Sequence, residues 1–388
     1  MSPCTRTNAL SEVTELAAAL IRIDTAAPTG KEGVAARMLA DMPDAAGADV
    51  CLHPLARGRD SLVARIPGSD PAEPALLFSG HLDTVPADEA TWHGDPLEPR
   101  LDGERLVGLG ASDMKCAVAA MALAVVDAAG RRRRRSIMLA VTAGEETECR
   151  GAASIAAELA RHPIGAVVIG EPTCGRVAVA HKGVAWLGLE TNGVAGHASS
   201  APERDNAALR MAHALVRLAA DGPLSASDAL LGAPTAAVTK LEAGGAPNVI
   251  PARCRATLDV RLVPGFDASV AMHEIQRRVG PGGHYRTPRR PGPDPVEQRR
   301  PLGPVRPSSS STRASRSGCR TSPTPPCSPP PWAIPRPWCT ARDPAQAHAA
   351  DESCSVAAMT DALARYRWMA AAWQTASTTG ARHAEAMV

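Results

Sequence analysis

The sequence carries almost no net charge of either sign. Its 42 Lys and Arg stand against 40 Asp and Glu, which leaves a net charge of +2 over 388 residues. This balance supplies no overall field that would attract nucleic acid or an acidic membrane surface. We therefore expect a small-molecule partner, with no nucleic acid and no membrane. The single basic run, Arg131 to Arg135, joins an Ala-rich segment to an apolar one and is interpreted as a solvated connecting loop.

Three other features are also missing from the sequence. The ten cysteines show no CxxC pairing, and the amino terminus lacks the charged start, apolar core and cleavage site of a signal peptide. No apolar run approaches the roughly 20 residues that span a bilayer. These absences predict a protein of the reducing cytoplasm.

The order of apolar segments predicts an α/β protein of two domains. Two amino-terminal helices are expected at 11–24, capped at Ser11, and at 32–47. Over the rest of residues 1–175, the apolar runs "ALLFSG", "SIMLAVTAG" and "GAVVIGEPT" alternate with helices expected at 113–129 and 151–161. This alternation predicts a mostly parallel sheet covered by helices. Over 176–284 the strands become longer and alternating, with a helix between them, which indicates an inserted α+β domain with antiparallel strands and helices on one face.

Polar side chains follow the apolar strands of the first domain. His81, the pair Glu145 and Glu146, and Glu171 each lie just past the end of a predicted strand. In open α/β sheets this edge is where ligands bind. Each residue alone is more typical of a cap or loop, but their recurrence at equivalent places favours a site.

Two more residues extend this set. Asp113 lies near a predicted helix start, and His348 lies in "AQAHAADESC". Two His and three carboxylates suit zinc or a similar first-row metal. Two divalent ions carry +4, while Asp113, Glu146, Glu171 and one hydroxide supply −4, so the charge count favours two ions. Asp113 would then bridge them, and each ion would take one His and one Glu.

Two neighbouring acids are expected to have other roles. Asp83 is two residues from His81 in an extended segment, so its carboxylate is predicted to accept a hydrogen bond from the ring nitrogen that does not bind metal. Glu145 and Glu146 cannot face the metals in the same way, so one should be a ligand and the other should handle the water proton.

Seven ordered segments resemble the acetylornithine deacetylase and succinyl-diaminopimelate desuccinylase family of dinuclear zinc hydrolases, which also includes carboxypeptidases and aminoacylases. The resemblance covers about 9–280 and 343–370. The segments are "SGHLDTVP", "GLGASDMK", "TAGEET", "GEPT", "GVAGHASSAPERDNA", "APNVIPARC" and "QAHAADE".

The resemblance assigns roles to the residues in these segments. It implies two zinc ions per subunit, with cobalt as a substitute, and a lid domain at 176–284 that forms a homodimer. The general base is then Glu145, and Asp83 orients His81. The implied metal ligands are His81, Asp113, Glu146, Glu171 and His348.

Three lid residues are also implied to act at the site. His197 resembles a histidine that reaches a neighbouring subunit, while Asn248 and Arg261 resemble substrate-contacting positions. Two alternatives stay open: Asn248 could be a turn residue and Arg261 a surface ion pair. The implied function is hydrolysis of the amide bond of N-acyl amino acids or short peptides through a water activated by two metals.

One segment departs from this pattern. Residues 281–340 hold sixteen of the 35 prolines and ten arginines, without helical or strand periodicity. A disordered insertion is the simplest interpretation. Alternatively, a family-like "PTVVYGP" in GC-rich codons, read one base late, gives RPWCTAR, the sequence of 336–342. We therefore hypothesise that 285–342 is aberrant and out of frame, with the catalytic domain resuming at 343–388. Resequencing the gene would test this.

The aberrant segment raises an alternative for the function. A chain that lacks elements of its catalytic domain could be an inactive remnant that only binds metal or dimerises.

Overall fold

The computed structural model describes residues 3–27, 30–148, 150–173, 175, 178, 180–199, 206–280, 283–286 and 346–375. The chain divides into two compact units. The described residues up to 178, together with 346–375, form the first unit, and those from 180 to 286 form the second. The aberrant segment 285–342 lies outside the described residues, except for the end of one short strand.

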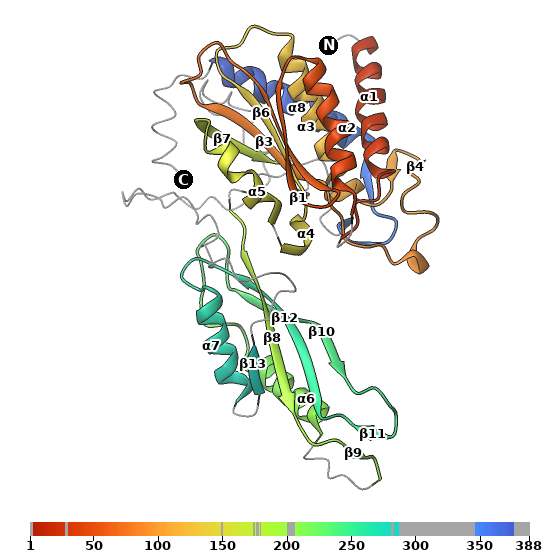
Figure 1. The fold of residues 1–388 in the computed structure, drawn as a ribbon, viewed down its shortest axis with the longest axis vertical. Helices are drawn as coiled ribbons and strands as arrows, with labels where there is room; N and C mark the ends of the chain where they lie inside the picture. The colour runs from red at the N-terminus through yellow and green to blue at the C-terminus, as the bar shows by residue number, and fades with distance from the viewer. Residues whose placement is uncertain are drawn as a thin grey trace, which may run out of the picture. The chain divides into compact units, whose positions relative to one another are not determined.

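The first unit combines a five-stranded sheet with helices on both faces (Figure 1). Its helices are α1 Pro3–Ile21, α2 Glu32–Ala45, α3 Cys116–Ala129, α4 Glu145–Glu148, α5 Arg150–Leu159 and α8 Val356–Thr375. Two short helical turns are η1 Glu89–Thr91 and η2 Ala111–Lys115. Its strands are β1 Asp49–Ala56, β2 Arg59–Ile66, β3 Ala75–His81, β4 Arg100–Asp102, β5 Arg105–Val107, β6 Ile137–Thr142, β7 Ile164–Ile169 and β14 Ser353–Ser355.

The main sheet has the order β1-β2-β6-β3-β7 and confirms the α/β class. Strand β3 runs parallel to both β6 and β7, as the alternation of strands and helices predicts. Strands β1 and β2 add an antiparallel hairpin, so the sheet is mixed. The apolar pattern of the sequence did not predict this hairpin, although Gly58 supplies the positive φ that its turn requires.

The core lies on both faces of this sheet. On one face, Leu76, Phe78 and Leu139 pack with buried residues of α1, α2, α3 and α8, and the rings of Phe78 and Tyr366 meet edge to face at 5.3 Å. On the other face, Leu77 and Met138 pack with Ile155 of α5. Successive strand residues point to opposite faces, so the apolar residues at the start of β3 serve both layers.

Two helix boundaries differ from the expectation. Helix α3 begins at Cys116, three residues after the expected start, because Asp113 and Met114 have non-helical backbone angles within the preceding turn. Helix α1 begins at Pro3, well before the expected capped start near Ser11. Proline suits the first turn of a helix, and the residues that follow contain no helix breaker.

The second unit is an antiparallel sheet with two helices on one face (Figure 1). Leu187 and Leu258 are paired neighbours on that face, and they pack with residues of both helices. Its strands are β8 Gly183–Asn192, β9 Gly196–His197, β10 Thr235–Ala243, β11 Val249–Ile250, β12 Arg253–Leu262 and β13 Gly283–Arg286. Its helices are α6 Ala207–Ala220 and α7 Ala268–Val279.

Within the described residues, every helix is too short or too polar to cross a membrane.

The basic run at 131–135 is more than a solvated loop, which corrects the interpretation from sequence. Arg135 is only 3% exposed, donates to Glu73 at 2.8 Å and to the Trp373 carbonyl at 2.9 Å, and lies over the Trp373 ring. Arg133 donates to the carbonyls of Ala128 and Ala129 at the end of α3. The run therefore ties α3 and α8 to the sheet.

Arg135→Met should lower the free energy of unfolding by about 3 kcal/mol, because it leaves the buried Glu73 carboxylate without one of its cations. The exposed Arg132, three residues away, provides the control: Arg132→Met should change stability by less than about 0.5 kcal/mol. Urea unfolding of the two variants measures the difference. Equal effects would show that the run acts only through its total charge.

Candidate functional site

The parallel strands bring four of the predicted residues to one edge of the sheet. His81 is the last residue of β3, Glu145 and Glu146 begin α4 just after β6, and Glu171 follows β7 by two residues. Because β3 pairs in parallel with β6 on one side and β7 on the other, these strands end side by side. His81 therefore lies between the glutamates of its two neighbours.

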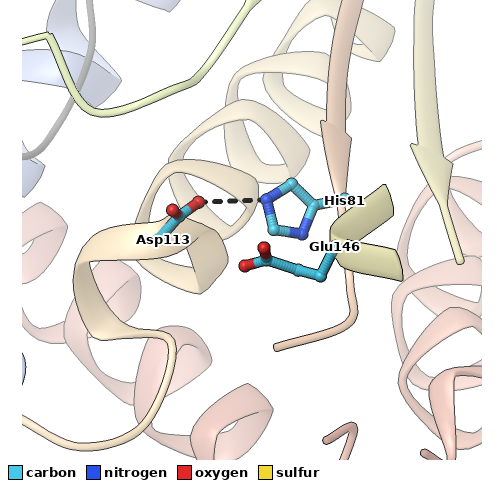
Figure 2. A group of neighbouring side chains, drawn as sticks. All are labelled: His81, Asp113 and Glu146. Carbon is cyan, nitrogen blue, oxygen red and sulfur yellow. Dashed lines mark hydrogen bonds and ion pairs between the residues drawn. The ribbon is translucent and has the colours of Figure 1, made fainter. Parts of the chain in front are cut away.

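Asp113 reaches this edge from the turn before α3. Figure 2 shows its carboxylate facing the His81 ring, with Glu146 beside both. The distance from Asp113 Oδ1 to His81 Nε2 is 3.0 Å, and one ligand atom from each of the three residues lies within 4.8 Å of the others. These three side chains could hold a metal ion.

His348 and Glu171 complete the cluster. His348 Nε2 lies 3.0 Å from Glu146 Oε1 and 3.6 Å from Asp113 Oδ2. On the other side, Glu171 Oε1 lies 3.8 Å from His81 Nε2. The structure therefore brings together all five residues that the sequence analysis proposed as metal ligands.

The geometry of Asp83 differs from the expectation. His81 Nδ1 lies 2.9 Å from the Asp83 backbone carbonyl oxygen and 3.7 Å from its carboxylate, so the backbone accepts the ring hydrogen bond. The buried Asp83 carboxylate instead accepts the backbone N–H groups of Glu145 and Glu146, both at 3.0 Å. Amides at a helix start have no intrahelical partner and attract a carboxylate. Asp83 thus positions His81 with its backbone and the two glutamates with its side chain.

The cluster holds more negative charge than its own histidines compensate. Burial alone would lower the pKa of His81, but Asp113, Glu171 and Asp83 outweigh it and raise this pKa well above its usual value. Burial raises the pKa of Glu171 to about 7, and neighbouring carboxylates add to the rise.

The base candidate Glu145 shares this environment, since burial raises its pKa as well. A site of this kind would be stabilised by a bound cation.

The donor set fits a first-row metal. In the neutral imidazole, with Nδ1 of His81 donating to a backbone carbonyl, Nε2 has a free lone pair and faces the carboxylates. Imidazole and carboxylate donors without thiolate suit zinc and its neighbours.

The predicted lid residues lie in the second unit. His197 on β9 pairs with Val249 on β11, and the Asn248 carbonyl accepts the N–H of Ala198 at 3.0 Å, so His197 and Asn248 are brought together. Arg261 lies near the carboxyl end of β12, whereas Arg253 is the first residue of that strand. The two residues are eight positions apart, or about 26 Å at 3.3 Å per residue.

The guanidinium of Arg261 is engaged in an exposed ion pair. It donates to Asp259 at 2.8 and 3.2 Å. A surface ion pair was the alternative to substrate binding that the sequence left open for Arg261.

Two buried charged residues at the site were not identified from sequence. Glu352 is 2% exposed, and its carboxylate accepts three backbone N–H groups of the turn that carries Asp113. Lys115 is 1% exposed and donates to the Ile23 carbonyl at 3.0 Å. Burial lowers the pKa of Lys115 to about 8. Both lie within segments that resemble family motifs, but their burial depends on distant parts of the chain.

A model of peptidase family M20/M25/M40 matches residues 77–292. The chain is 32% identical over 300 residues to a succinyl-diaminopimelate desuccinylase from Dinoroseobacter shibae, covering 71% of this chain and 78% of that enzyme. It is also 32% identical over 248 residues to an acetylornithine deacetylase from Proteus mirabilis, covering 61% of this chain and 63% of that enzyme. The chain thus spans less than two thirds of the deacetylase.

The fold has solved counterparts as well. A metallo-carboxypeptidase of the M20 family from Sulfolobus solfataricus superposes with a TM-score of 0.67 at 15% identity, covering 94% of this chain and 99% of that one. The chain belongs to peptidase family M20/M25/M40 and is a hydrolase. The resemblance inferred from the seven sequence segments is confirmed.

The crowding of carboxylates predicts how the metal-free protein responds to pH. The folded-state pKa of Glu171 lies above its usual 4.5, so ionisation costs more in the folded state and stability falls as the pH rises toward about 7. The pKa of His81 is also raised in the folded state. The stabilisation that protonated His81 contributes is therefore fully present below pH 6.5 and is lost as the pH rises through the folded-state pKa. Both changes have the same sign.

We therefore expect the Tm of the metal-free protein to fall as the pH rises from about 5 to about 8. Glu171→Gln should flatten this profile, because the group that must ionise is removed. Calorimetry of metal-stripped protein at several pH values measures both. A wild-type Tm that rises over this interval would contradict the charge crowding.

Proposed function

We propose that this hydrolase cleaves the amide bond of N-acyl amino acids or short peptides with two zinc ions. One observation supports the pair of ions most directly: the two oxygens of Asp113 face different partners. Oδ1 faces His81, which has Glu171 beside it, and Oδ2 faces His348, which has Glu146 beside it. These contacts support the expectation that Asp113 would bridge two ions and that each ion would take one His and one Glu.

The proposed reaction uses the metals and the acids in separate roles. Bound at these five ligands, the ions would supply Lewis acidity toward the substrate carbonyl and the attacking water. Glu145 takes the proton of that water as its oxygen adds to the acyl carbon. Glu145 then returns the proton to the amide nitrogen as the C–N bond breaks, which yields a carboxylic acid and an amine. The raised pKa of Glu145 suits both transfers.

The assignment of Glu145 as base and Glu146 as ligand is supported by their contacts. Glu146 lies 3.0 Å from His348 and within the group formed with His81 and Asp113. The backbone amides of both glutamates are held by the Asp83 carboxylate, so their side chains leave the start of α4 from fixed positions.

The second unit is proposed to be a lid that also forms a homodimer. Strand β10 is an edge strand whose nine residues are all exposed, and exposed edges can pair with another chain. Trp186 and Val184 are also half exposed, at 48% and 47%. His197 and Asn248 would contact substrate from this lid. Light scattering tests the dimer, and a monomer would remove the argument for a shared site.

The alternative of an inactive remnant receives no support from this geometry. All five ligand candidates meet, including His348, which follows the aberrant segment.

Glu145→Gln should keep both metals but lower turnover by about 10²- to 10⁴-fold, because the water proton loses its acceptor. The matched variant Glu146→Gln should instead lose metal. Metal content by atomic emission, measured beside turnover, separates the two effects. Loss of metal from Glu145→Gln with retention in Glu146→Gln would reverse the assignment.

The substrate class can be tested with N-acetyl, N-succinyl and N-formyl amino acids and dipeptides, assayed with zinc or cobalt. We expect activity only on amides with a free carboxylate, which Arg261 would hold by two hydrogen bonds in exchange for its ion pair with Asp259. Arg261→Met should raise KM for these substrates about tenfold, since one such contact contributes about 1.4 kcal/mol. Arg255→Met, on the same strand, is the control and should leave KM unchanged. Activity on esters alone would refute the proposal.

A further inference from the structure

The turn that carries Asp113 is held by a carboxylate from the other end of the chain. Glu352 accepts the backbone N–H of Gly110 at 2.8 Å, of Ser112 at 2.7 Å and of Asp113 at 2.8 Å. Its own backbone carbonyl accepts the N–H of Gly108 at 2.9 Å. An ionised carboxylate accepts such bonds more strongly than a neutral side chain does, and Glu352 is only 2% exposed.

The same residue anchors the segment that carries His348. Glu352 immediately precedes β14, which pairs with β5 through Ser353 opposite Val107. His348, four residues before Glu352, has a φ of 62°, so the chain reverses locally rather than continuing a regular element. Glu352 is therefore the point at which the Asp113 turn and the His348 segment are joined.

We propose that Glu352 is a positioning residue that sets Asp113 and His348 at the spacing that two metals require. The inference rests on the two-metal site proposed above. Asp113 and His348 come from segments more than 230 residues apart, and Asp113 Oδ2 lies 3.6 Å from His348 Nε2. Loss of the three amide contacts would remove the bonds between the Glu352 side chain and the backbone of the Asp113 turn, and would leave the Gly108 bond to the Glu352 carbonyl.

The neighbouring Asp351 provides a matched control. It also ties the His348 segment to the part of the chain before the Asp113 turn, through Arg100 of β4 at 2.6 Å and His93, but it does not contact the Asp113 turn. Its φ of 52° is one that asparagine tolerates. Asp351→Asn and Glu352→Gln are thus the same chemical change, from a carboxylate to an amide, at adjacent positions. Only Glu352 contacts the backbone amides of the turn.

The experiment compares wild type, Glu352→Gln and Asp351→Asn as full-length proteins. Zinc affinity is measured by competition with a chromophoric chelator, the ligand geometry by the absorption spectrum of the cobalt form, and the backbone by hydrogen exchange of metal-free protein. In Glu352→Gln one amide of the turn faces an NH₂ group instead of an oxygen.

We expect Glu352→Gln to lower metal affinity about 10- to 100-fold, as loss of a supporting contact behind a ligand does. Its cobalt spectrum should change, and hydrogen exchange over 108–114 should accelerate while that of β6 does not. Asp351→Asn should stay within about twofold of wild type by the same scale. Should Glu352→Gln fail to fold, Glu352→Asp, which keeps the charge on a shorter side chain, takes its place with the same expected direction.

Three results would overturn the inference. Faster exchange with wild-type affinity and spectrum would make Glu352 structural only. Equal losses in both variants would assign the effect to docking of the whole segment. Wild type that binds no zinc would remove the proposed function itself, and this failure is visible without any variant.

Discussion

The site depends on three parallel strands that end at the same edge of one sheet. Parallel pairing of β3 with β6 and β7 brings the residues at or just after the end of each strand into one small volume. Those residues are an imidazole and three glutamates, and Asp113 adds a fifth group from the turn before α3. Burial and mutual repulsion then raise the pKa of Glu171 to about 7, so the architecture concentrates negative charge that a cation would relieve.

The acids at this edge divide into two groups by what they contact. Asp113, Glu146 and Glu171 face the histidines with their side chains. Asp83 and Glu352 turn theirs to backbone amides, of Glu145 and Glu146 in one case and of the Asp113 turn in the other. A carboxylate bound to backbone N–H groups fixes the peptide itself, so every side chain that leaves that peptide starts from a defined position. This division explains why one edge needs more carboxylates than a metal site would use.

The sequence could predict the site residues whose position depends only on a short local pattern. His81, Glu146 and Glu171 follow apolar strands, and a strand end can be read from a short window. Burial of Glu352, Lys115 and Arg135 could not be found in this way, because each depends on partners far along the chain; Glu352 and the N–H of Asp113 are 239 residues apart. The same limit explains why the hydrogen bond predicted for the Asp83 carboxylate was wrong. Asp83 is two residues from His81, which predicted a contact between them. The backbone amides of Glu145 and Glu146, which bind the carboxylate instead, lie more than 60 residues further along the chain.

The carboxyl-terminal segment illustrates how such distant contacts decide what the chain can do. The family match ends at 292, close to the start of the Pro- and Arg-rich stretch, yet residues 346–375 belong to the first unit. Helix α8 contributes Tyr366 to the core beside Phe78, and Arg367 pairs with Asp127 of α3. Apolar burial of α8 can therefore hold this segment on the sheet, but it does not fix the few ångströms that separate His348 from Asp113. That spacing requires a directional contact close to both residues, and Glu352 is the buried group that makes one.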